Sequence, residues 1–331
     1  MVIDLHSHYF PLEAAGQPGA PVTVAEGGEP TRLVVAGHAM SLDAGLFDLA
    51  RQRDDLQRQG LTRRVLAVPP FTILYELPAA EGLRWSRALN DSLARAQARD
   101  SERFIGFATV PLQDAEAAAQ ELERASGELG LQGVEILTSV NGVGLDTPAL
   151  DRFWRAAERV GLPILVHPHY VSGAERMGDY HLRNLIGNPA ETAQAGARLL
   201  FGGVIERFPG LKLILSHGGG ALPHLIGRLR QGYAVRAETR ARASDPLAGL
   251  TRLYYDTVVF DPTVLRHLVE LVGASQVVVG TDYPFDMSEG RPVDLVRAAG
   301  LGQAEQETIL QAAERLLPTG VAGRASGSQG V

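Results

Sequence analysis

Side chains that bind metals in proteins stand at the ends of four strand-like runs of this sequence. His6 and His8 lie two residues apart in the first run, and His167 closes the fifth. His217 and Asp282 end the sixth and the eighth. Side chains alternate along a strand, so His6 and His8 point to the same side. Three imidazoles and a carboxylate with one open position are typical of zinc or a similar divalent metal. We therefore predict a metal site at His6, His8, His167 and Asp282, with His217 beside it as a general acid or base.

Other polar residues on these runs leave alternatives open. His217 could itself be a ligand or a structural residue, and His169, just after the fifth run, either lines a pocket or supports a ligand. Glu135 and Asp256, in the fourth and seventh runs, could bridge a second metal, although a strand carboxylate more commonly pairs with a nearby arginine. The three glycines 218–220 lack the following lysine and hydroxyl residue of a phosphate loop, which predicts a tight turn with close backbone approach.

The composition excludes several kinds of chemistry and of partner. The 331 residues include no cysteine, which rules out disulfides, thiolate nucleophiles and thiolate metal ligands. The single lysine, Lys212, lies in an apolar run, so Schiff-base catalysis is not expected. A formal charge of −7 without a basic block argues against nucleic acid, and no apolar run reaches the roughly 20 residues of a membrane span. Charged residues occur too early for a signal peptide, so we expect a soluble, cytoplasmic protein without nucleic-acid or membrane partners.

Runs typical of strands alternate with runs typical of helices along the chain. The strand-like runs are residues 2–8, 63–70, 104–112, 133–138, 163–168, 211–218, 253–259 and 277–284. Eight strands alternating with helices favour a (β/α)8 barrel, since an open doubly wound sheet needs only about six. We therefore predict an α/β fold: one TIM barrel over residues 1–317, with a small insertion after strand 1. The metal-binding residues would then meet at the carboxyl ends of the strands.

Two helix boundaries can also be predicted from particular residues. Apolar residues at helical spacing precede Gly161, and glycine tolerates the left-handed conformation that commonly follows the last helical residue. Asn188, Pro189 and Glu191 suggest the start of another helix: a cap, a proline in the first turn and an acid soon after.

Two segments interrupt the alternation of strands and helices. Residues 10–45 are rich in glycine and proline, and residues 171–188 follow the fifth strand. Both come after the carboxyl end of a strand, where barrel enzymes have their active sites, so we predict that both are lids over a pocket. Residues 318–331 are poor in apolar side chains, which predicts a flexible tail.

Four motifs, taken together and in order, resemble those of a known family. They are His-Ser-His at 6–8, LVHPH at 165–169, LSHGGGALPHLIGRL at 215–229 and GTDYPFD at 280–286. The chain resembles the amidohydrolase superfamily from residue 1 to about residue 317. It is most similar to the branch of non-oxidative decarboxylases that includes aminocarboxymuconate-semialdehyde decarboxylase and the resorcylate-type decarboxylases.

This resemblance implies roles for particular residues. It implies that His6, His8, His167 and Asp282 bind one divalent metal, which is usually zinc and in some members manganese. It implies that His217 hydrogen-bonds the metal-bound water and that Phe285 packs on the substrate. It also implies that Arg228 reaches a neighbouring subunit's site to bind a substrate carboxylate, so a homodimer is expected. Met40 stands where the semialdehyde decarboxylase has a second carboxylate-binding arginine, which makes that particular substrate doubtful.

Three functions follow from these observations, in decreasing order of expectation. The first is decarboxylation of a small unsaturated or aromatic acid, with His217 handling the proton, Asp282 as the second candidate, and Arg228, Phe285 and His169 binding the substrate. The second is hydrolysis of a lactone, amide or related carbonyl compound by a metal-activated water, because the ligand set alone does not separate the two reactions. The third is a barrel that binds a ligand without catalysis.

Overall fold

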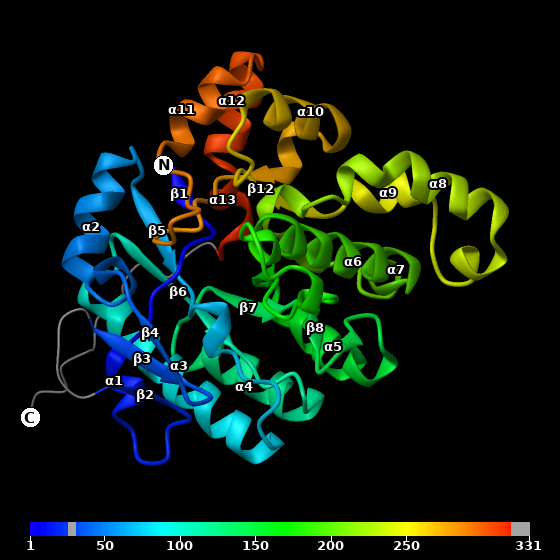
Figure 1. Ribbon diagram of the computed structural model, residues 1–331. Coiled ribbons are helices and arrows are strands. Elements are labelled where there is room, and N and C mark those ends of the chain that lie inside the picture. Colours follow the sequence, from blue (N-terminus) through cyan, green and yellow to red (C-terminus); the bar gives the residue numbers. More distant parts are fainter. Residues whose placement is uncertain (26–30, 319–331) are drawn as a thin grey trace, which may run out of the picture.

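The computed structural model describes residues 1–25 and 31–318, and it confirms the predicted barrel. Eight parallel strands pair in sequence order around the sheet (Figure 1). These strands are β1 (Ile3–Asp4), β5 (Arg63–Leu66), β6 (Phe104–Thr109), β7 (Gly133–Leu137), β10 (Pro163–His167), β11 (Lys212–Leu215), β12 (Tyr254–Asp256) and β13 (Val277–Val278). Each coincides with one of the eight strand-like runs. The predicted tail 318–331 lies, apart from Pro318, outside the described residues.

Backbone hydrogen bonds beyond the ends of β1 and β13 bring the first and last strands together. The N–H of Leu5 donates to the carbonyl of Val279 at 2.9 Å, and the N–H of His8 donates to that of Tyr283 at 2.7 Å. Ser7 and Tyr283 form an isolated parallel bridge. The barrel is therefore closed by the two segments that carry His8 and Asp282.

Helices follow most of the strands and cover the outside of the barrel (Figure 1). They are α2 (Leu49–Arg58), α3 (Ala79–Arg99), α4 (Ala115–Gly127), α5 (Asp151–Val160), α6 (Asn188–Phe201), α7 (Val204–Arg207), α8 (Ile226–Val235), α9 (Pro246–Leu250), α10 (Pro262–Val272), α11 (Pro292–Ala298), α12 (Gln303–Leu310) and α13 (Ala312–Leu316). No helix within the described ranges is both long and apolar enough to cross a membrane.

The two predicted helix boundaries differ in how well they match. Helix α5 ends at Val160, and the following Gly161 has a φ of +72°, the expected left-handed conformation. Helix α6 begins at Asn188 with a proline in its first turn, as predicted. The prediction that Asn188 caps this helix is wrong, because a π-helix over Arg183–Gly187 runs directly into α6 and gives Asn188 helical dihedral angles.

The core divides into a layer under the outer helices and a cluster that includes alternate strand residues such as Ile105 and Phe107. Helix α13 packs on this second cluster through Leu316. The Lys212 ammonium, at the amino end of β11, donates to the carbonyl of Leu316 at 2.9 Å. Helix α13 thus covers the amino ends of the strands and leaves their carboxyl ends for a site.

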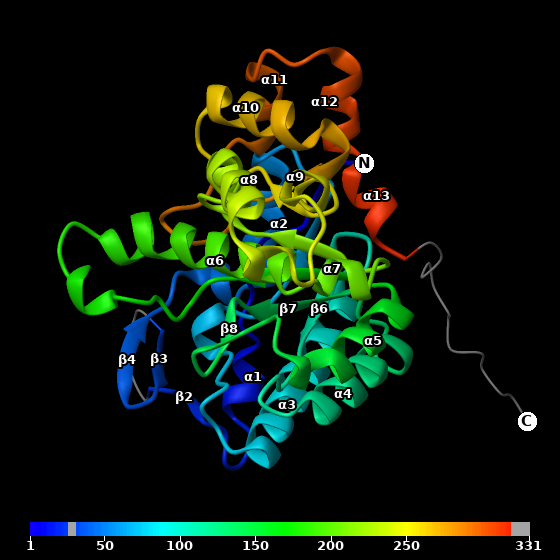
Figure 2. The ribbon, with the colours of Figure 1, turned by 90° about the vertical axis from the view of Figure 1, so that its right-hand side faces the viewer.

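The two predicted lid segments have structure of their own. The insertion forms helix α1 (Leu12–Ala15) and an antiparallel sheet of β2 (Val22–Val24), β3 (Arg32–Val35) and β4 (His38–Ser41). The segment after β10 contains a 3-10 turn at Ala174–Arg176 and then the π-helix Arg183–Gly187. Figure 2 shows both segments on one side of the barrel. Elsewhere, a short hairpin of β8 (Ser139–Val140) and β9 (Val143–Gly144) follows β7.

Candidate metal centre

Four buried side chains meet at the carboxyl ends of the barrel strands. His6, His8, His167 and Asp282 each offer one ligand atom, and these atoms all lie within 4.8 Å of one another. The Asp282 Oδ1 atom is 3.1 Å from His8 Nε2, 3.4 Å from His6 Nε2 and 3.9 Å from His167 Nε2. The structure therefore brings together the four residues that the sequence analysis selected as metal ligands.

The second ring nitrogen of each histidine is occupied by a hydrogen bond. The Nδ1 atom of His8 lies 3.2 Å from the carbonyl of Val68, and that of His167 lies 2.8 Å from the carbonyl of Pro168. A carbonyl only accepts, so both rings carry their proton on Nδ1 and present an Nε2 lone pair. The Nε2 atoms of His6 and His167 are buried and have no hydrogen-bond partner within the described structure. This donor set fits a divalent metal ion, which would take up those lone pairs.

The charge states of His8, His167 and Asp282 suit metal binding. Burial lowers the pKa of both His8 and His167, so the two rings are held in the neutral form that binds metals. Burial acts against the charged form of Asp282, but the surrounding imidazoles, His6 first among them, outweigh it and hold the pKa of Asp282 well below its usual range. Burial also acts against the charged form of His6, but Asp282 and Asp256 outweigh it and raise the pKa of His6 well above its usual value. Without a metal the centre thus combines two neutral imidazoles, a His6 ring that favours its protonated form, and a carboxylate.

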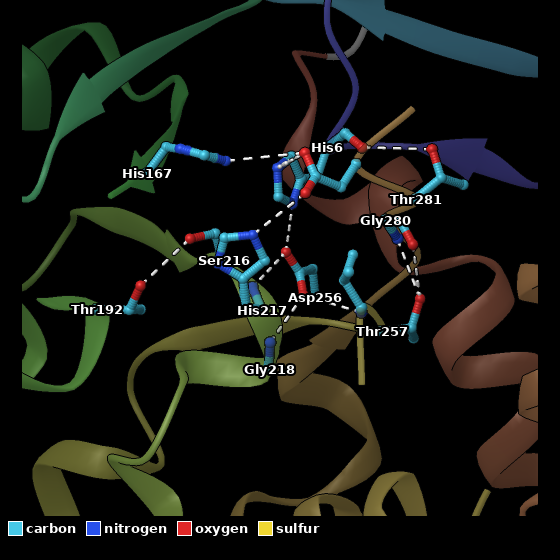
Figure 3. A network of polar contacts seen from close by, with 12 residues as sticks. His6, His167, Thr192, Ser216, His217, Gly218, Asp256, Thr257, Gly280 and Thr281 are labelled. Carbon is cyan, nitrogen blue, oxygen red and sulfur yellow. Dashed lines mark hydrogen bonds and ion pairs between the residues drawn. The ribbon is translucent and has the colours of Figure 1, made fainter. Parts of the chain in front are cut away.

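Asp256, at the end of β12, connects the metal centre to His217 (Figure 3). Its Oδ2 atom lies 2.5 Å from His6 Nδ1 and accepts from the backbone N–H of His217 at 2.9 Å. Its Oδ1 atom accepts from the N–H groups of Gly218 and Val258 at 2.8 and 3.0 Å. It forms no ion pair with an arginine in the described chain, so the expected arginine pairing is wrong, and its carboxylate instead faces His6. It lies outside the four-residue cluster.

Glycines allow this part of the backbone to pack closely. A Cβ atom on Gly280 would lie 2.8 Å from the Cβ of Asp256 and 2.9 Å from that of His6, too close for any larger residue. The predicted turn at Gly218–Gly220 is confirmed, with φ values of +60°, +77° and +59°. A side chain on Gly220 would collide with the carbonyl of Pro189. The glycines let His6 approach Asp256 and let α6 approach the turn.

His217 lies beside the four ligands without being one of them. Its Nε2 atom is 3.4 Å from Asp282 Oδ2, while its Nδ1 atom is buried without a hydrogen-bond partner in the described structure. The side chain is 14% exposed, so it can exchange protons with a bound molecule or with solvent. This position suits a general acid or base next to the metal.

Glu135, on β7, is fully buried near the same centre. Neither carboxylate oxygen has a hydrogen-bond partner among the described residues, and the nearest imidazole atom is His8 Nδ1 at 4.0 Å. Burial is the main cause that raises the pKa of Glu135 well above its usual value. The expectation that Glu135 pairs with an arginine is therefore wrong, and the structure does not place it in the metal cluster either.

Two adjoining cavities open above the metal centre. The first, of about 410 Å³, reaches His167 and Asp282 and is lined by His169 and Phe285, two of the three candidate substrate-binding residues. The Phe285 ring packs against that of His8, with ring centroids 5.1 Å apart. The second cavity, of about 270 Å³, is lined by His217, and both cavities share Asp282, Asn184 and Asn188.

The remaining candidate, Arg228, lies elsewhere. It is exposed on helix α8 and lines neither cavity of its own chain. Sequence reasoning assigned none of the four cavity residues of the 171–188 segment to the site, namely His181, Arg183, Asn184 and Asn188. Their segment carries no periodic pattern, so only its place after β10 marked it as part of a site.

The protein is similar to known decarboxylases over most of its length. Residues 3–319 match the model of the amidohydrolase family. The chain is 33% identical over 305 residues to 2-amino-3-carboxymuconate-6-semialdehyde decarboxylase of Dictyostelium discoideum, covering 89% of this chain and 85% of that protein. It is 28% identical to 6-methylsalicylic acid decarboxylase of Penicillium expansum, with 85% and 84% covered. A structure of 5-carboxyvanillate decarboxylase from Novosphingobium aromaticivorans, with bound manganese, matches with a TM-score of 0.71, 27% identity and coverage of 82% and 81%.

Proposed function

The chain belongs to the amidohydrolase family, and on that basis we propose that it is a metal-dependent decarboxylase of an aromatic or unsaturated carboxylic acid. The observation that carries the proposal is the buried cluster of three imidazoles and one carboxylate, with His217 beside it. The similarity to 2-amino-3-carboxymuconate-6-semialdehyde decarboxylase and to 6-methylsalicylic acid decarboxylase favours decarboxylation over hydrolysis.

The chemistry of decarboxylation assigns a task to each part of the site. Loss of CO2 leaves an electron pair on carbon, which needs charge stabilisation and then a proton. A divalent metal held by His6, His8, His167 and Asp282 would supply Lewis-acid stabilisation when bound. His217 delivers the proton to the substrate carbon, with Asp282 as the second candidate for this role. Phe285 and His169 line the cavity where an aromatic ring would bind.

Zinc is the metal we propose, with manganese as the alternative. Three imidazole nitrogens and one carboxylate oxygen form a donor set that zinc accepts readily. Manganese prefers oxygen donors, but the related 5-carboxyvanillate decarboxylase has it bound. Elemental analysis of protein purified without added metal decides between the two.

We further propose a homodimer in which Arg228 enters the neighbouring site and binds a substrate carboxylate. Helix α8 projects from the barrel in Figure 1 and buries none of its residues within its own chain. The apolar side chains of Leu185, Phe260 and Val264 line the cavity of His217 and are exposed as well. A second copy would cover these groups. An inactive His217→Asn chain mixed with an inactive Arg228→Ala chain should then recover activity, because a mixed dimer holds one complete site.

The experiment that tests the proposed reaction compares CO2 release with uptake of water. A panel of aromatic and muconate-type acids, offered with esters, lactones and amides, should give CO2 from an acid and no hydrolysis. His217→Ala should lower turnover about 10²–10⁴-fold while the bound metal stays at the wild-type amount. Hydrolysis without CO2 would identify the alternative enzyme, and metal lost from the His217 variant would contradict the division of roles. The single barrel over residues 1–317 and the cytoplasmic location remain predictions.

A further inference from the structure

One arginine is buried among the described residues, and the proposed reaction gives it no task. Arg64, on β5, is completely buried, and its Nε atom lies 3.3 Å from the equally buried Asp4 carboxylate. Its terminal nitrogens donate to the side-chain carbonyls of Gln52, at 3.2 Å, and of Gln59. Burying a charged pair costs free energy that the attraction between the charges often does not recover. Stability alone therefore does not account for this pair.

Asp4 joins the two backbone segments that carry His6 and Asp282. Its Oδ1 atom accepts hydrogen bonds from the N–H groups of His6 and Thr281, both at 3.1 Å. Its Oδ2 atom accepts from the Thr281 hydroxyl at 2.6 Å and is the atom that faces Arg64. Because Thr281 directly precedes Asp282, a single carboxylate connects Arg64 to the backbone on one side of that ligand.

Tyr283 connects the same arginine to the other side of Asp282. The guanidinium carbon of Arg64 lies 3.9 Å from the centroid of the Tyr283 ring, which is a cation–π contact. The Tyr283 N–H donates to the Thr281 hydroxyl at 3.1 Å. Arg64 thus contacts the residue after Asp282 directly and the residue before it through Asp4. Asp282 itself has a φ of +60°, a conformation that persists only when its surroundings support it.

We propose that Arg64 is a positioning residue for the metal centre: by fixing Thr281 and Tyr283 it sets the direction of the Asp282 carboxylate. This inference rests on the proposed role of Asp282 as a metal ligand. Arg64 lines neither cavity above the centre, so it acts through the backbone of its neighbours. A guanidinium suits this task, because its flat face stacks on an aromatic ring while the N–H groups at its edge bind oxygen atoms.

The metal affinity of Arg64→Gln tests the proposal without turnover. Removing a positive charge would by itself strengthen the binding of a cation, whereas loss of positioning weakens it, so the sign of the change separates the two effects. We expect the Kd for zinc, measured by competition with a chelator, to rise about 10–100-fold. The visible absorption of the cobalt-loaded protein should change as well, since it reports the geometry of the ligands. Arg64→Lys should recover part of the affinity.

Arg63→Gln is the matched control for this measurement. Arg63 precedes Arg64 on β5, but its side chain is partly exposed and donates to the carbonyl of Ser101 at 3.1 Å. This variant loses the same charge at a position that solvent screens, so the zinc Kd should stay within about twofold of the wild-type value.

Two variants of Tyr283 test the same contact without changing any charge, and they decide the question if Arg64→Gln does not fold. Tyr283→Phe keeps a ring over Arg64 and loses the hydrogen bond to Asp55, whereas Tyr283→Leu loses both. We expect the zinc Kd of Tyr283→Phe to stay within about threefold of wild type and that of Tyr283→Leu to rise about tenfold, as fits the loss of a buried cation–π contact.

The possible outcomes separate this inference from the proposed function. A wild-type zinc Kd and cobalt spectrum in folded Arg64→Gln would overturn the role of Arg64, and so would equal affinities in the two Tyr283 variants. Lower stability with unchanged metal affinity would overturn it too, because the role would then be structural only. Wild-type protein that binds no metal would reject the metal-dependent function and this inference with it. Wild-type protein that binds metal without releasing CO2 would reject the reaction and keep the role of Arg64.

Discussion

His217 and Asp282 have backbone conformations that side-chain-bearing residues rarely adopt. Their φ values are +56° and +60°, and such outliers cost of the order of 1–3 kcal/mol each. Hydrogen bonds hold both in place: His217 N–H donates to Asp256 at 2.9 Å, and Asp282 N–H donates to the carbonyl of His6 at 2.8 Å. The polar network therefore offsets a local strain that aims both side chains at the centre.

Replacing Asp256 by Asn should weaken metal binding by about 10–100-fold. The amide keeps the size of the side chain but loses the charge that faces His6 Nδ1 and orients that ring. Competition with a chelator of known affinity measures the change. Asp261→Asn is the control, since Asp261 accepts from Thr263 N–H at 2.7 Å at the start of α10, away from the metal. An unchanged metal Kd in Asp256→Asn would show that His6 needs no carboxylate partner.

At the level of residues, the four candidate metal ligands could be predicted from the sequence, but Asp256, which orients one of them, could not. His6, His8, His167 and Asp282 could be selected because each stands near the end of a strand-like run and has metal-binding chemistry. The role of Asp256 could not be read locally, because its partner His6 is 250 positions away. One physical rule could have found it: a ligating histidine commonly donates its second nitrogen to a carboxylate.

At the level of elements, one face of helix α2 supports three segments of the site. The Gln52 amide donates to the carbonyls of His8 and Gly45, at 2.8 and 2.6 Å. Three positions later, Asp55 accepts from the hydroxyl of Tyr283 at 2.6 Å. Residues three apart lie on the same side of a helix. Helix α2 thus connects the first strand, the end of the insertion and the loop after Asp282.

The close packing at Gly45 predicts a loss of stability when a methyl group is added. The Cβ atom of Gly45→Ala would meet the hydroxyl of Tyr283 and lie 2.7 Å from the Cβ of Pro284. Overpacking of this kind costs about 1–3 kcal/mol, which a urea titration detects as a lower midpoint. Gly127→Ala is the control, because nothing lies within 4 Å of its added Cβ. If both variants unfold at the same urea concentration, Gly45 does not fix the loop.

The hydrogen bond between Asp55 and Tyr283 predicts a pH-dependent contribution to stability. Burial opposes the charged form of Asp55, but Tyr283 and Arg51 outweigh it and lower its pKa. The contribution is therefore fully present above the unfolded value of about 3.8 and is lost as the pH falls through the folded pKa. Asp55→Asn should cost about 1.5–3 kcal/mol at pH 7 and progressively less towards pH 3.

Urea unfolding of the metal-free protein across this pH range measures that contribution. The exposed neighbour Asp54→Asn provides the control and should change stability little at any pH. A cost of Asp55→Asn that stays constant from pH 7 to pH 3 would contradict the assignment.

At the level of the whole molecule, the barrel was predictable and the covering segments were not. The strands are buried and rich in apolar residues, so their sequence runs stand out; β10 and β11 are examples. Strand β4 (His38–Ser41) has no buried residue, and therefore no alternating pattern marks it. The sheet of β2, β3 and β4 depends on pairing between short segments, which a local pattern does not reveal.

Metal removal should lower the stability of the whole molecule. A ligand that binds only the folded state at about 100 times its Kd contributes about 2.7 kcal/mol, so the thermal midpoint should rise with the logarithm of metal concentration. Scanning calorimetry of the chelated protein with added zinc or manganese measures this dependence. His167→Ala should lose most of it, because one of the four ligands is gone. A midpoint that ignores metal in the wild type would argue against the centre.

The closure of the barrel between its first and last strands also determines when the site can exist during synthesis. His8 and Asp282 are 274 positions apart, yet their side chains lie 3.1 Å from each other. At ~5–20 residues per second, a ribosome needs roughly 14–55 s to pass from one to the other. Throughout that time the segment after β13, which pairs with the β1 segment in the folded barrel, has not been made. The β1 segment therefore has one unpaired edge. The nascent chain therefore carries His6 and His8 long before it can assemble the metal centre. The catalytic site can form only in the last stage of folding.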